Sequence, residues 1–455
     1  MAKVKSKYVC QNCGYETAGY LGKCPECGSW GSFVEEINFS ETKSNNPISV
    51  PDNVPPMKLN EIEMNSEIRL KTGISEFDRV LGGGIVQGSL VLIAGDPGIG
   101  KSTILLQTSG ELCKGGKKVL YISAEESASQ IKLRAERLDV KSENLYIYPQ
   151  TNLELMKKHI DSMRPDLVIV DSIQAIYTSE IQSSAGSVSQ IRECCNSLMQ
   201  IAKSQNVSII VIGHVTKEGN IAGPKVLEHM VDTVIQFEGD KYKTYRILRS
   251  IKNRFGNTSE VGIFEMGAKG LNEVINPSEL FMKEYNQTQT PGSTVIVTSE
   301  GTRPLLVEIQ ALVGTTPYPA PRRIANGVDT GRVLQILAVL EKRIGLNLSK
   351  QDVYVNVIGG IDVNEPAADL GIALAIVTCV RDVVFDPHTA IIGEIGLSGE
   401  IRAVNHIEKR INEAQKLGFK RIIIPETNDL QDKIEGIQII KVKRILEAIT
   451  RGVSK

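Results

Sequence analysis

The apolar residues of this 455-residue chain fall into short runs of strand length rather than into long apolar segments. In the first half, four such runs carry no charged residue, and a polar side chain follows each within two residues. Runs of this kind predict strands that a sheet buries on both faces. The four predicted strands cover residues 89–94, 119–123, 167–170 and 207–212.

Helical stretches between these strands, beginning near residue 103, predict a parallel α/β sheet. A hairpin-like pattern at residues 234–238 and 243–249 follows the last strand. In parallel α/β sheets, nucleotides bind at the carboxyl ends of the strands. The polar residues that follow the strands are therefore the candidates for a site.

A second α/β pattern occupies the last third of the chain, after a polar stretch at residues 285–291. We predict strands near residue 295 and at residues 305–313, 353–358 and 421–424, and helices at 332–343, 367–380 and 407–417. The predicted domain boundaries are residues 1–35, a linker at 36–58, residues 59–272, a linker at 273–291, and residues 292–455.

Composition narrows the class of protein. Hydrophobic residues make up 41% and charged residues 23%, as in globular proteins, and this length predicts two or three domains. The net charge of −1 means that any contact with nucleic acid must come from local basic patches. No apolar run is long enough to span a bilayer, and no apolar segment follows the basic N-terminus, so we expect neither a membrane protein nor a secretory signal. We expect the protein to be located in the cytoplasm.

A phosphate-binding loop joins the first predicted strand to the first helix. Its glycines let backbone N–H groups surround phosphate oxygens at the positive end of the helix. Lys101 would reach the terminal phosphates of ATP, and the Ser102 hydroxyl would ligate Mg²⁺. The alternative is a glycine-rich turn without a ligand. The loop consists of Gly95, Asp96, Pro97, Gly98, Ile99, Gly100, Lys101 and Ser102.

Two further carboxylates are candidates for the same site. Asp171 follows a fully apolar strand and suits the acid that supports Mg²⁺. Glu125 is a candidate general base that positions the attacking water, and Glu126 is its rival because both follow the same strand.

Four of the eight cysteines form two C-x-x-C pairs near the N-terminus: Cys10, Cys13, Cys24 and Cys27. Two such turns, each followed by a glycine, bring four thiolates into the tetrahedron that structural Zn²⁺ prefers. Disulfides are the alternative, which a reducing cytoplasm disfavours. The other four lie in apolar or helical surroundings and are expected in the core: Cys113, Cys194, Cys195 and Cys379.

Residues 72–85, T-G-I-x-x-F-D-x-x-L-G-G-G-I, lead into the phosphate loop and resemble the superfamily of RecA-type recombinases and hexameric ATPases. The resemblance implies that Glu125, in I-x-A-E, is the catalytic glutamate. It also implies that His214 is a polar switch that senses the γ-phosphate and moves a DNA loop; the alternative is a histidine satisfied by hydrogen bonds. The polar segments 178–187 and 216–225 match loops that face single-stranded DNA, and Lys217 and Lys225 are candidate phosphate contacts.

The pentapeptide at residues 252–256, K-N-R-F-G, is similar to the hallmark of the bacterial RadA (Sms) family of DNA repair ATPases. The resemblance implies that Lys252 and Arg254 reach the γ-phosphate bound by a neighbouring subunit. A salt-bridged surface pair is the alternative.

The last domain resembles the protease domain of Lon through residues 365–369, E-P-A-A-D, and 392–399. Active Lon enzymes carry a nucleophilic serine paired with a lysine. Here Ala367 occupies the serine position, and Glu408 the lysine position, with Lys409 one residue off. We therefore expect a scaffold without peptidase activity. Two basic pairs are candidate DNA contacts or solvated surface: Arg322–Arg323 and Lys342–Arg343.

Together these patterns predict an α/β protein: a RecA-like P-loop ATPase core with an N-terminal zinc ribbon and a C-terminal Lon-protease-like domain. The resemblance implies a DNA-dependent ATPase in recombinational repair, a homohexameric ring that moves on single-stranded DNA, drives branch migration of branched DNA and partners a RecA-type recombinase. Its cofactors would be ATP, Mg²⁺ and Zn²⁺. The alternatives are a nucleotide-switched DNA-binding adaptor with slow hydrolysis, and an ATP-dependent protease.

Overall fold

The computed structural model divides the chain into two compact units, Met1–Ile275 and Asn276–Lys455. The structure describes residues 5–10, 14–38, 58, 69–214, 226–239, 245–282, 285, 290–359, 361–431 and 434–452. The division falls within the predicted linker 273–291. We propose that the finer division into a ribbon, two linkers and two larger domains follows the predicted boundaries. Among the described residues, no helix combines the length and apolar character needed to cross a membrane.

The N-terminal ribbon is a small antiparallel sheet of β1 (Lys5–Cys10), β2 (Glu16–Thr17) and β3 (Phe33–Asn38), in the order β2-β1-β3. Its apolar centre holds Cys10, Cys24 and Phe33, with Tyr8 packed against them. So small a core is typical of a domain that a metal stabilises.

A nine-stranded sheet forms the centre of the first unit, with the order β14-β13-β12-β11-β6-β10-β9-β7-β8. The six strands from β11 to β8 run parallel, and β12, β13 and β14 continue the sheet in antiparallel fashion. The four predicted strands and the predicted hairpin are confirmed. The strand bounds are β6 (Leu90–Gly95), β7 (Val119–Ser123), β8 (Leu145–Pro149), β9 (Leu167–Asp171), β10 (Ser208–His214), β11 (Thr233–Glu238), β12 (Tyr245–Asn253), β13 (Val261–Gly267) and β14 (Gly270–Glu273).

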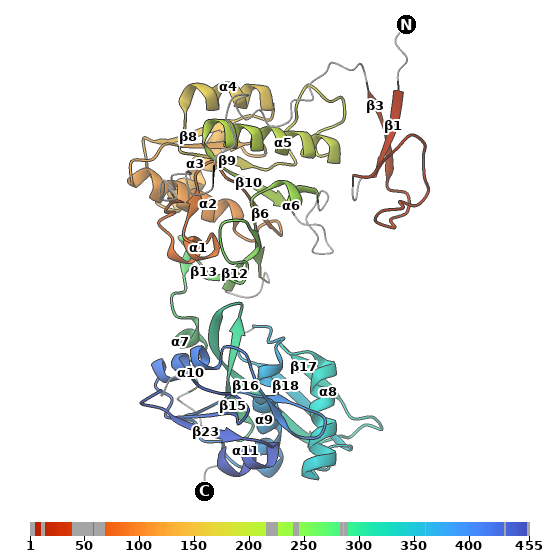
Figure 1. Ribbon diagram of the computed structural model, residues 1–455, viewed down its shortest axis with the longest axis vertical. Coiled ribbons are helices and arrows are strands. Elements are labelled where there is room, and N and C mark those ends of the chain that lie inside the picture. The colour runs from red at the N-terminus through yellow and green to blue at the C-terminus, as the bar shows by residue number, and fades with distance from the viewer. Residues whose placement is uncertain are drawn as a thin grey trace. The chain divides into compact units, whose positions relative to one another are not determined.

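Helices cover both faces of this sheet, which explains why its strands are apolar throughout (Figure 1). Along β6, Val91 and Ile93 join the core on the side of α1, α2 and α3, whereas Leu90 and Leu92 join the core beneath α4 and α5. This alternation is the period of two that a strand imposes on its side chains. The helices are α1 (Ser75–Val80), α2 (Lys101–Lys114), α3 (Ala128–Arg137), α4 (Leu153–Met163), α5 (Val188–Gln205) and the short α6 (Val226–Met230).

Polar caps set where three of these helices begin. The side chains of Ser127, Asn152 and Ser187 each accept a hydrogen bond from a backbone N–H in the first turn of α3, α4 and α5. A short antiparallel pair, β4 (Arg69–Leu70) and β5 (Ile85–Val86), precedes β6. Helix α2 instead follows Gly100 with no side-chain cap, so the N–H groups of its first turn have no side-chain acceptor.

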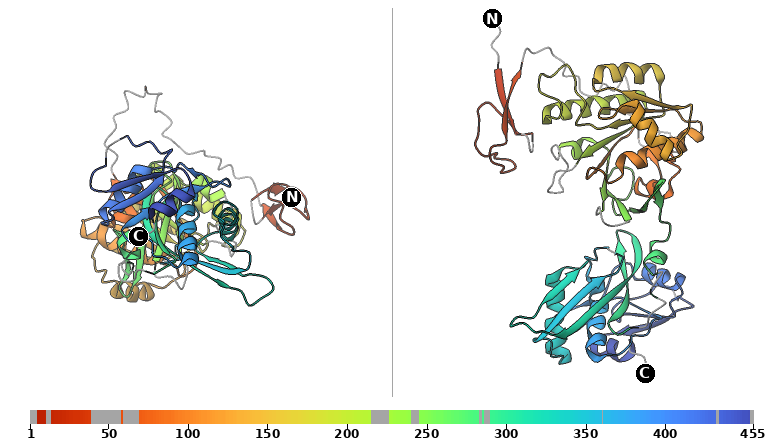
Figure 2. Two further views of the ribbon diagram at one scale, coloured as in Figure 1. Left: turned by 90° about the horizontal axis from the view of Figure 1, so that it is seen from below. Right: turned by 180° about the vertical axis from the view of Figure 1, so that it is seen from behind.

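The second unit contains a mixed seven-stranded sheet in the order β17-β18-β16-β15-β19-β22-β23, and its long β15–β16 hairpin is visible from behind in Figure 2. Helix α9 is buried along most of its length, as its apolar sequence requires. The strands are β15 (Ser293–Glu300), β16 (Arg303–Thr315), β17 (Arg323–Asn326), β18 (Gln351–Val357), β19 (Thr389–Ile391), β20 (Glu394–Ile395), β21 (Ile401–Arg402), β22 (Arg421–Pro425) and β23 (Gln438–Val442). The helices are α7 (Pro277–Phe281), α8 (Thr330–Val339), α9 (Asp369–Arg381), α10 (Ile407–Lys416) and α11 (Ile445–Gly452).

Two helices of this unit differ in detail from the prediction. The expected helix at 332–343 is α8 followed by a π-helical turn, Leu340–Ile344, which Gly345 ends in the left-handed conformation. The expected helix at 367–380 starts with a 3₁₀ turn, Pro366–Ala368, because proline at the first position favours a tight turn before the regular helix begins.

Candidate nucleotide and metal sites

The predicted phosphate loop connects the carboxyl end of β6 to the first turn of α2. Gly95, Gly98 and Gly100 all have positive φ, at 156°, 78° and 123°. A Cβ on Gly95 would lie 2.7 Å from the Phe237 carbonyl oxygen, and one on Gly100 would lie 3.1 Å from a side-chain carbon of Met266. The loop therefore needs glycine for its backbone conformation at all three positions, and for the close approach of β11 at Gly95.

Lys101 extends back over this loop. Its Nζ donates to the carbonyl oxygens of Gly95, at 2.7 Å, and Asp96, at 2.9 Å. Burial lowers the pKa of the Lys101 ammonium, while Asp171 and Asp96 act in the opposite direction. The amine thus lies inside the loop, where phosphate oxygens could replace the two carbonyl acceptors with stronger charge-assisted bonds.

A buried tyrosine links the two candidate magnesium residues. The Tyr121 hydroxyl donates to Asp171 Oδ2 at 2.6 Å, and the Ser102 side chain is near enough to lower the pKa of Tyr121 slightly against the larger effects that raise it. Burial, followed by the charge of Asp171, raises the pKa of Tyr121 well above its usual value, so it stays a neutral donor. A serine hydroxyl and a carboxylate are the oxygen ligands that fit Mg²⁺. Sequence analysis missed Tyr121; its one signal was a hydroxyl inside an otherwise apolar run.

Glu125 joins two other strand ends. Its Oε1 accepts a hydrogen bond from the Ser172 hydroxyl, which follows β9, and lies 3.4 Å from Nε2 of His214, the last residue of β10. Nδ1 of His214 is buried without a hydrogen-bond partner among the described residues. Since β7, β9 and β10 are neighbours in the sheet, their parallel pairing brings these three side chains together.

Its rival Glu126 is held elsewhere. The Glu126 carboxylate forms a 2.6 Å ion pair with Arg134 of α3, and its backbone is tied to the Ser123 hydroxyl. The Glu126 carboxylate is thus bound to helix α3, whereas Glu125 lies beside Ser172 and the candidate residue His214. The geometry favours Glu125 as the base.

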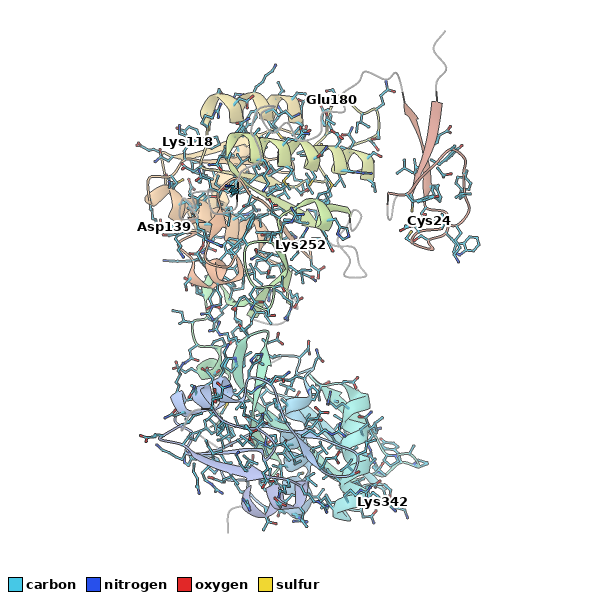
Figure 3. The ribbon with its side chains drawn as sticks, viewed as in Figure 1. Cys24, Lys118, Asp139, Glu180, Lys252 and Lys342 are labelled. Atoms are coloured by element: carbon cyan, nitrogen blue, oxygen red, sulfur yellow. The ribbon has the colours of Figure 1, made fainter. Side chains whose placement is uncertain are left out.

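Lys252 and Arg254 lie at the opposite end of the sheet (Figure 3 labels Lys252). Lys252 Nζ donates to the carbonyl oxygens of Glu228, His229 and Val231, at 2.7, 3.3 and 2.9 Å. The two basic residues therefore do not join their own phosphate loop.

Strand register explains this separation. Asn253 and Lys252 pair with Thr233 and Val234 at the start of β11, which in turn pair with Val91 and Leu92 near the start of β6. The phosphate loop begins at the other end of β6, at Gly95.

Three of the four predicted zinc ligands converge in the ribbon, where Figure 3 labels Cys24. The sulfur atoms of Cys10, Cys24 and Cys27 all lie within 4.8 Å of one another, and no disulfide joins them. The N–H groups of Gly14 and Gly28 close the two turns by bonding the carbonyls of Cys10 and Cys24. Cys13 lies outside the described residues. Convergent thiols on two turns fit a closed tetrahedral Zn²⁺ site.

The remaining cysteines are placed as predicted. Cys113, Cys194 and Cys195 are buried, and Cys379 is partly buried. Burial raises the pKa of Cys194 and of Cys195 to about 12, which keeps both thiols protonated and unreactive.

In the second unit, a partly buried ion pair lies near the positions that match the Lon catalytic residues. Arg410 makes two bonds to the Glu365 carboxylate, at 2.6 and 2.7 Å, and another to the Val297 carbonyl. Ala367 is buried in the core beside this segment, Glu408 accepts the Gln431 N–H, and Lys409 is exposed. No nucleophile or paired lysine stands at these positions.

The candidate DNA contacts have mixed surroundings. Arg323 donates to the carbonyl oxygens of Leu348 and Gln351, whereas Arg322 lies over the Tyr318 ring at 4.0 Å. Lys342 and Arg343 are exposed. Lys217 and Lys225 lie outside the described residues.

The folded core and its loop define a class: this is a RecA-like ATPase of the KaiC type with an N-terminal zinc ribbon. The family described as KaiC ATPase matches residues 70–275, the rubredoxin metal-binding domain matches residues 8–35, and subunit ChlI of Mg-chelatase matches residues 330–428. A solved KaiC-like protein of Pyrococcus horikoshii is 20% identical, with a TM-score of 0.39, over 46% of this chain and 99% of that one.

Relatives identify the family. DNA repair protein RadA of Bacillus subtilis is 52% identical over 454 residues, 99% of both chains, and RadA of Listeria monocytogenes is 52% identical over 457 residues, again 99% of both. The chain belongs to the RadA family of DNA repair ATPases.

Substitutions at the candidate nucleotide site should separate binding from hydrolysis. We expect Lys101→Ala to abolish productive phosphate binding, and Glu125→Gln to keep nucleotide binding while turnover falls by about 10²- to 10⁴-fold. Nucleotide binding and steady-state ATPase assays measure the two effects. Glu126→Gln is the matched control; if it is inactive and Glu125→Gln hydrolyses at the wild-type rate, the choice of base is wrong.

The ribbon should contain about one zinc ion per chain, because four thiolates complete the coordination shell. Metal analysis of the purified protein measures this ratio, and the double variant Cys24→Ser/Cys27→Ser should lose the metal. Zinc-free wild-type protein, or full zinc in the double variant, would contradict a Cys₄ site.

The second unit should have no peptidase activity, because it lacks the nucleophile. Incubation with casein and ATP should leave the substrate intact on a gel. Cleavage that persists in a Lys101→Ala preparation would mean that the Lon-like unit is an active protease.

Proposed function

We propose that this RadA-family ATPase is a DNA-dependent enzyme that acts on branched recombination intermediates. In this proposal it forms a homohexameric ring, moves on single-stranded DNA as a helicase does, and drives branch migration. We also propose a RecA-type recombinase as its partner and the cytoplasm, where bacterial DNA lies, as its compartment. The names of the relatives support the repair role.

The position of Lys252 and Arg254 is the observation that carries the assembly part of the proposal. Leu90 and Gly95 lie five residues apart on β6, which at about 3.3 Å per residue separates the two ends by about 16 Å. Asp232, which holds Arg254, bonds the Leu90 N–H at the far end. Basic residues so placed cannot serve their own loop, but they suit an ATP site that a second subunit completes.

Within one chain, the candidate residues divide the work of hydrolysis. Lys101 and the N–H groups of the loop would bind the β- and γ-phosphates, while Tyr121 orients Asp171 beside Ser102. Mg²⁺ bound there would neutralise charge on the phosphates as the γ-phosphoryl group leaves. Glu125 would orient the attacking water and accept its proton.

His214 offers a connection between hydrolysis and DNA. Its Nε2 faces Glu125, and the chain continues directly into residues 216–225, which carry Lys217 and Lys225. A change in the contact between His214 and Glu125 on γ-phosphate loss would move the start of this segment. Measurement of ATP turnover with and without single-stranded DNA tests the coupling; turnover that DNA does not stimulate would favour the slowly hydrolysing adaptor.

Mixing two inactive variants tests the shared site. Lys101→Ala should abolish turnover because productive phosphate binding is lost. Arg254→Ala should abolish turnover because a basic side chain supplied to the ATP site of a neighbouring subunit, here called the finger, contributes about 10³- to 10⁵-fold to the rate. Under conditions of subunit exchange, some interfaces pair an intact phosphate loop with an intact finger. ATPase activity should therefore partly return in the mixture.

A control mixture of wild type with Lys101→Ala must first show that one dead site leaves the other sites of the assembly active. If the control retains activity and the test mixture shows none, Arg254 acts within its own subunit or has no catalytic part.

A further inference from the structure

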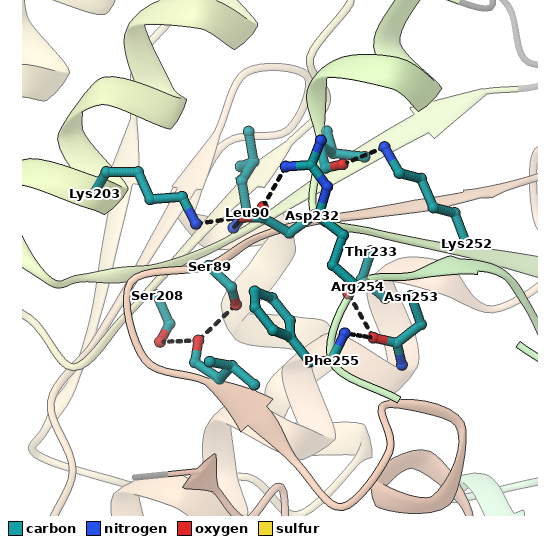
Figure 4. A network of polar contacts seen from close by, with 12 residues as sticks. Ser89, Leu90, Lys203, Ser208, Asp232, Thr233, Lys252, Asn253, Arg254 and Phe255 are labelled. Carbon is teal, nitrogen blue, oxygen red and sulfur yellow. Dashed lines mark hydrogen bonds and ion pairs between the residues drawn. The ribbon is translucent and has the colours of Figure 1, made fainter. Parts of the chain in front are cut away.

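A buried carboxylate at the base of the sheet, Asp232, holds Arg254, and sequence analysis assigned it no role. Asp232 is 1% exposed and directly precedes β11. Figure 4 shows its polar contacts. Its Oδ2 accepts the Leu90 N–H at 3.1 Å and the Lys203 ammonium at 2.9 Å. Its Oδ1 accepts Nη1 of Arg254 at 3.1 Å.

The two oxygens of Asp232 thus have different partners. Oδ2 is tied to the sheet and to α5 through Leu90 and Lys203, and these contacts hold the carboxylate in place. Among the described residues, the only hydrogen bond to Oδ1 comes from the guanidinium group of Arg254. A carboxylate so fixed can orient a long side chain that would otherwise sample many rotamers.

The backbone around Arg254 is fixed as well. The Arg254 N–H donates to the Asp232 carbonyl at 3.1 Å. The neighbouring Asn253 side chain accepts the Phe255 N–H at 2.9 Å and donates to the Leu81 carbonyl at 3.2 Å. Both the base and the tip of the Arg254 side chain are therefore held.

The guanidinium remains available on its other side. The Arg254 side chain is 53% exposed, and its planar fork has five N–H donors, of which Asp232 engages Nη1. Charge is also in excess here. Among the described residues, two cations, Lys203 and Arg254, share the single carboxylate of Asp232. The pair with Asp232 therefore orients the arginine without cancelling the local positive charge.

We propose that Asp232 is the positioning residue of the Arg254 finger: it fixes one edge of the guanidinium so that the free edge is presented to the γ-phosphate of an adjacent subunit. The inference rests on the proposed shared site. In this proposal Asp232 acts through Arg254 only.

The variant Asp232→Asn tests this role in the full-length protein. Asparagine has one acceptor oxygen, so it cannot serve both the Oδ1 partner and the Oδ2 partners. A misplaced reacting group typically loses on the order of 10²-fold in rate. We expect kcat for ATP to fall by about 10- to 100-fold, while KM stays within about twofold because the nucleotide's own loop is intact.

Asp166→Asn is the control for loss of a carboxylate that bridges a lysine and a backbone N–H, at a more exposed position. Asp166 also precedes a parallel strand and also accepts a lysine ammonium, from Lys117, and a backbone N–H, from Lys118, but it holds no finger. Its kcat should stay within about twofold of wild type. If both variants lose activity equally, the effect is general destabilisation and the proposal fails.

Mixing separates positioning from structural damage. Asp232→Asn mixed with Lys101→Ala should recover activity to the same extent as Arg254→Ala mixed with Lys101→Ala, because the missing element is the same. Recovery with Arg254→Ala but not with Asp232→Asn would overturn the role of Asp232 and leave the shared site intact. No recovery with either would overturn the shared site itself, and this inference with it.

Unchanged kcat in Asp232→Asn would also refute the proposal. Should that variant not fold, Asp232→Asn/Lys203→Gln removes both charges of the buried pair and takes its place, with the same expected loss and the same recovery on mixing.

Discussion

Parallel backbone pairing at the centre of the first unit is the constraint on which the candidate site depends. Because β6, β10, β9 and β7 are neighbours and run in the same direction, the residues that follow these strands all lie at the same end of the sheet, where the strands have their carboxyl ends. His214 pairs with Gly95, whereas Asp171 and Ser123 pair with each other two residues earlier along the sheet. The phosphate loop and the candidate magnesium and base residues therefore all lie at the carboxyl ends of these strands.

The same geometry places the other basic residues out of reach. Antiparallel β12 returns Lys252 and Arg254 to the amino ends of β11 and β6, where carbonyl oxygens and Asp232 hold them. A parallel sheet thus divides the candidate machinery between its two edges, and two copies of the chain can join the halves. This division is the physical basis of the proposed assembly, in which each interface would form one active site.

The second unit is well packed at the positions that match the Lon catalytic residues. The Arg410 side chain is nearly inaccessible and makes two direct bonds to the Glu365 carboxylate, which is partly exposed. Ala367 fills its position in the core without a polar atom. These features suit the expected scaffold, in which Ala367 and Glu408 stand at the positions of the serine and lysine of active Lon enzymes.

Contiguous patterns determined much of this protein from the sequence alone. The four apolar strands, the phosphate loop and the paired cysteines depend on neighbouring residues and on local backbone geometry, so short motifs are sufficient to predict them. The tertiary structure decided the rest. Tyr121 meets Asp171 across 50 positions, Asp232 meets Leu90 across 142, and the choice between Glu125 and Glu126 depends on where Arg134 of α3 points. Such contacts arise from strand order and side-chain direction, which a linear pattern does not contain, because each strand turns alternate side chains to opposite faces.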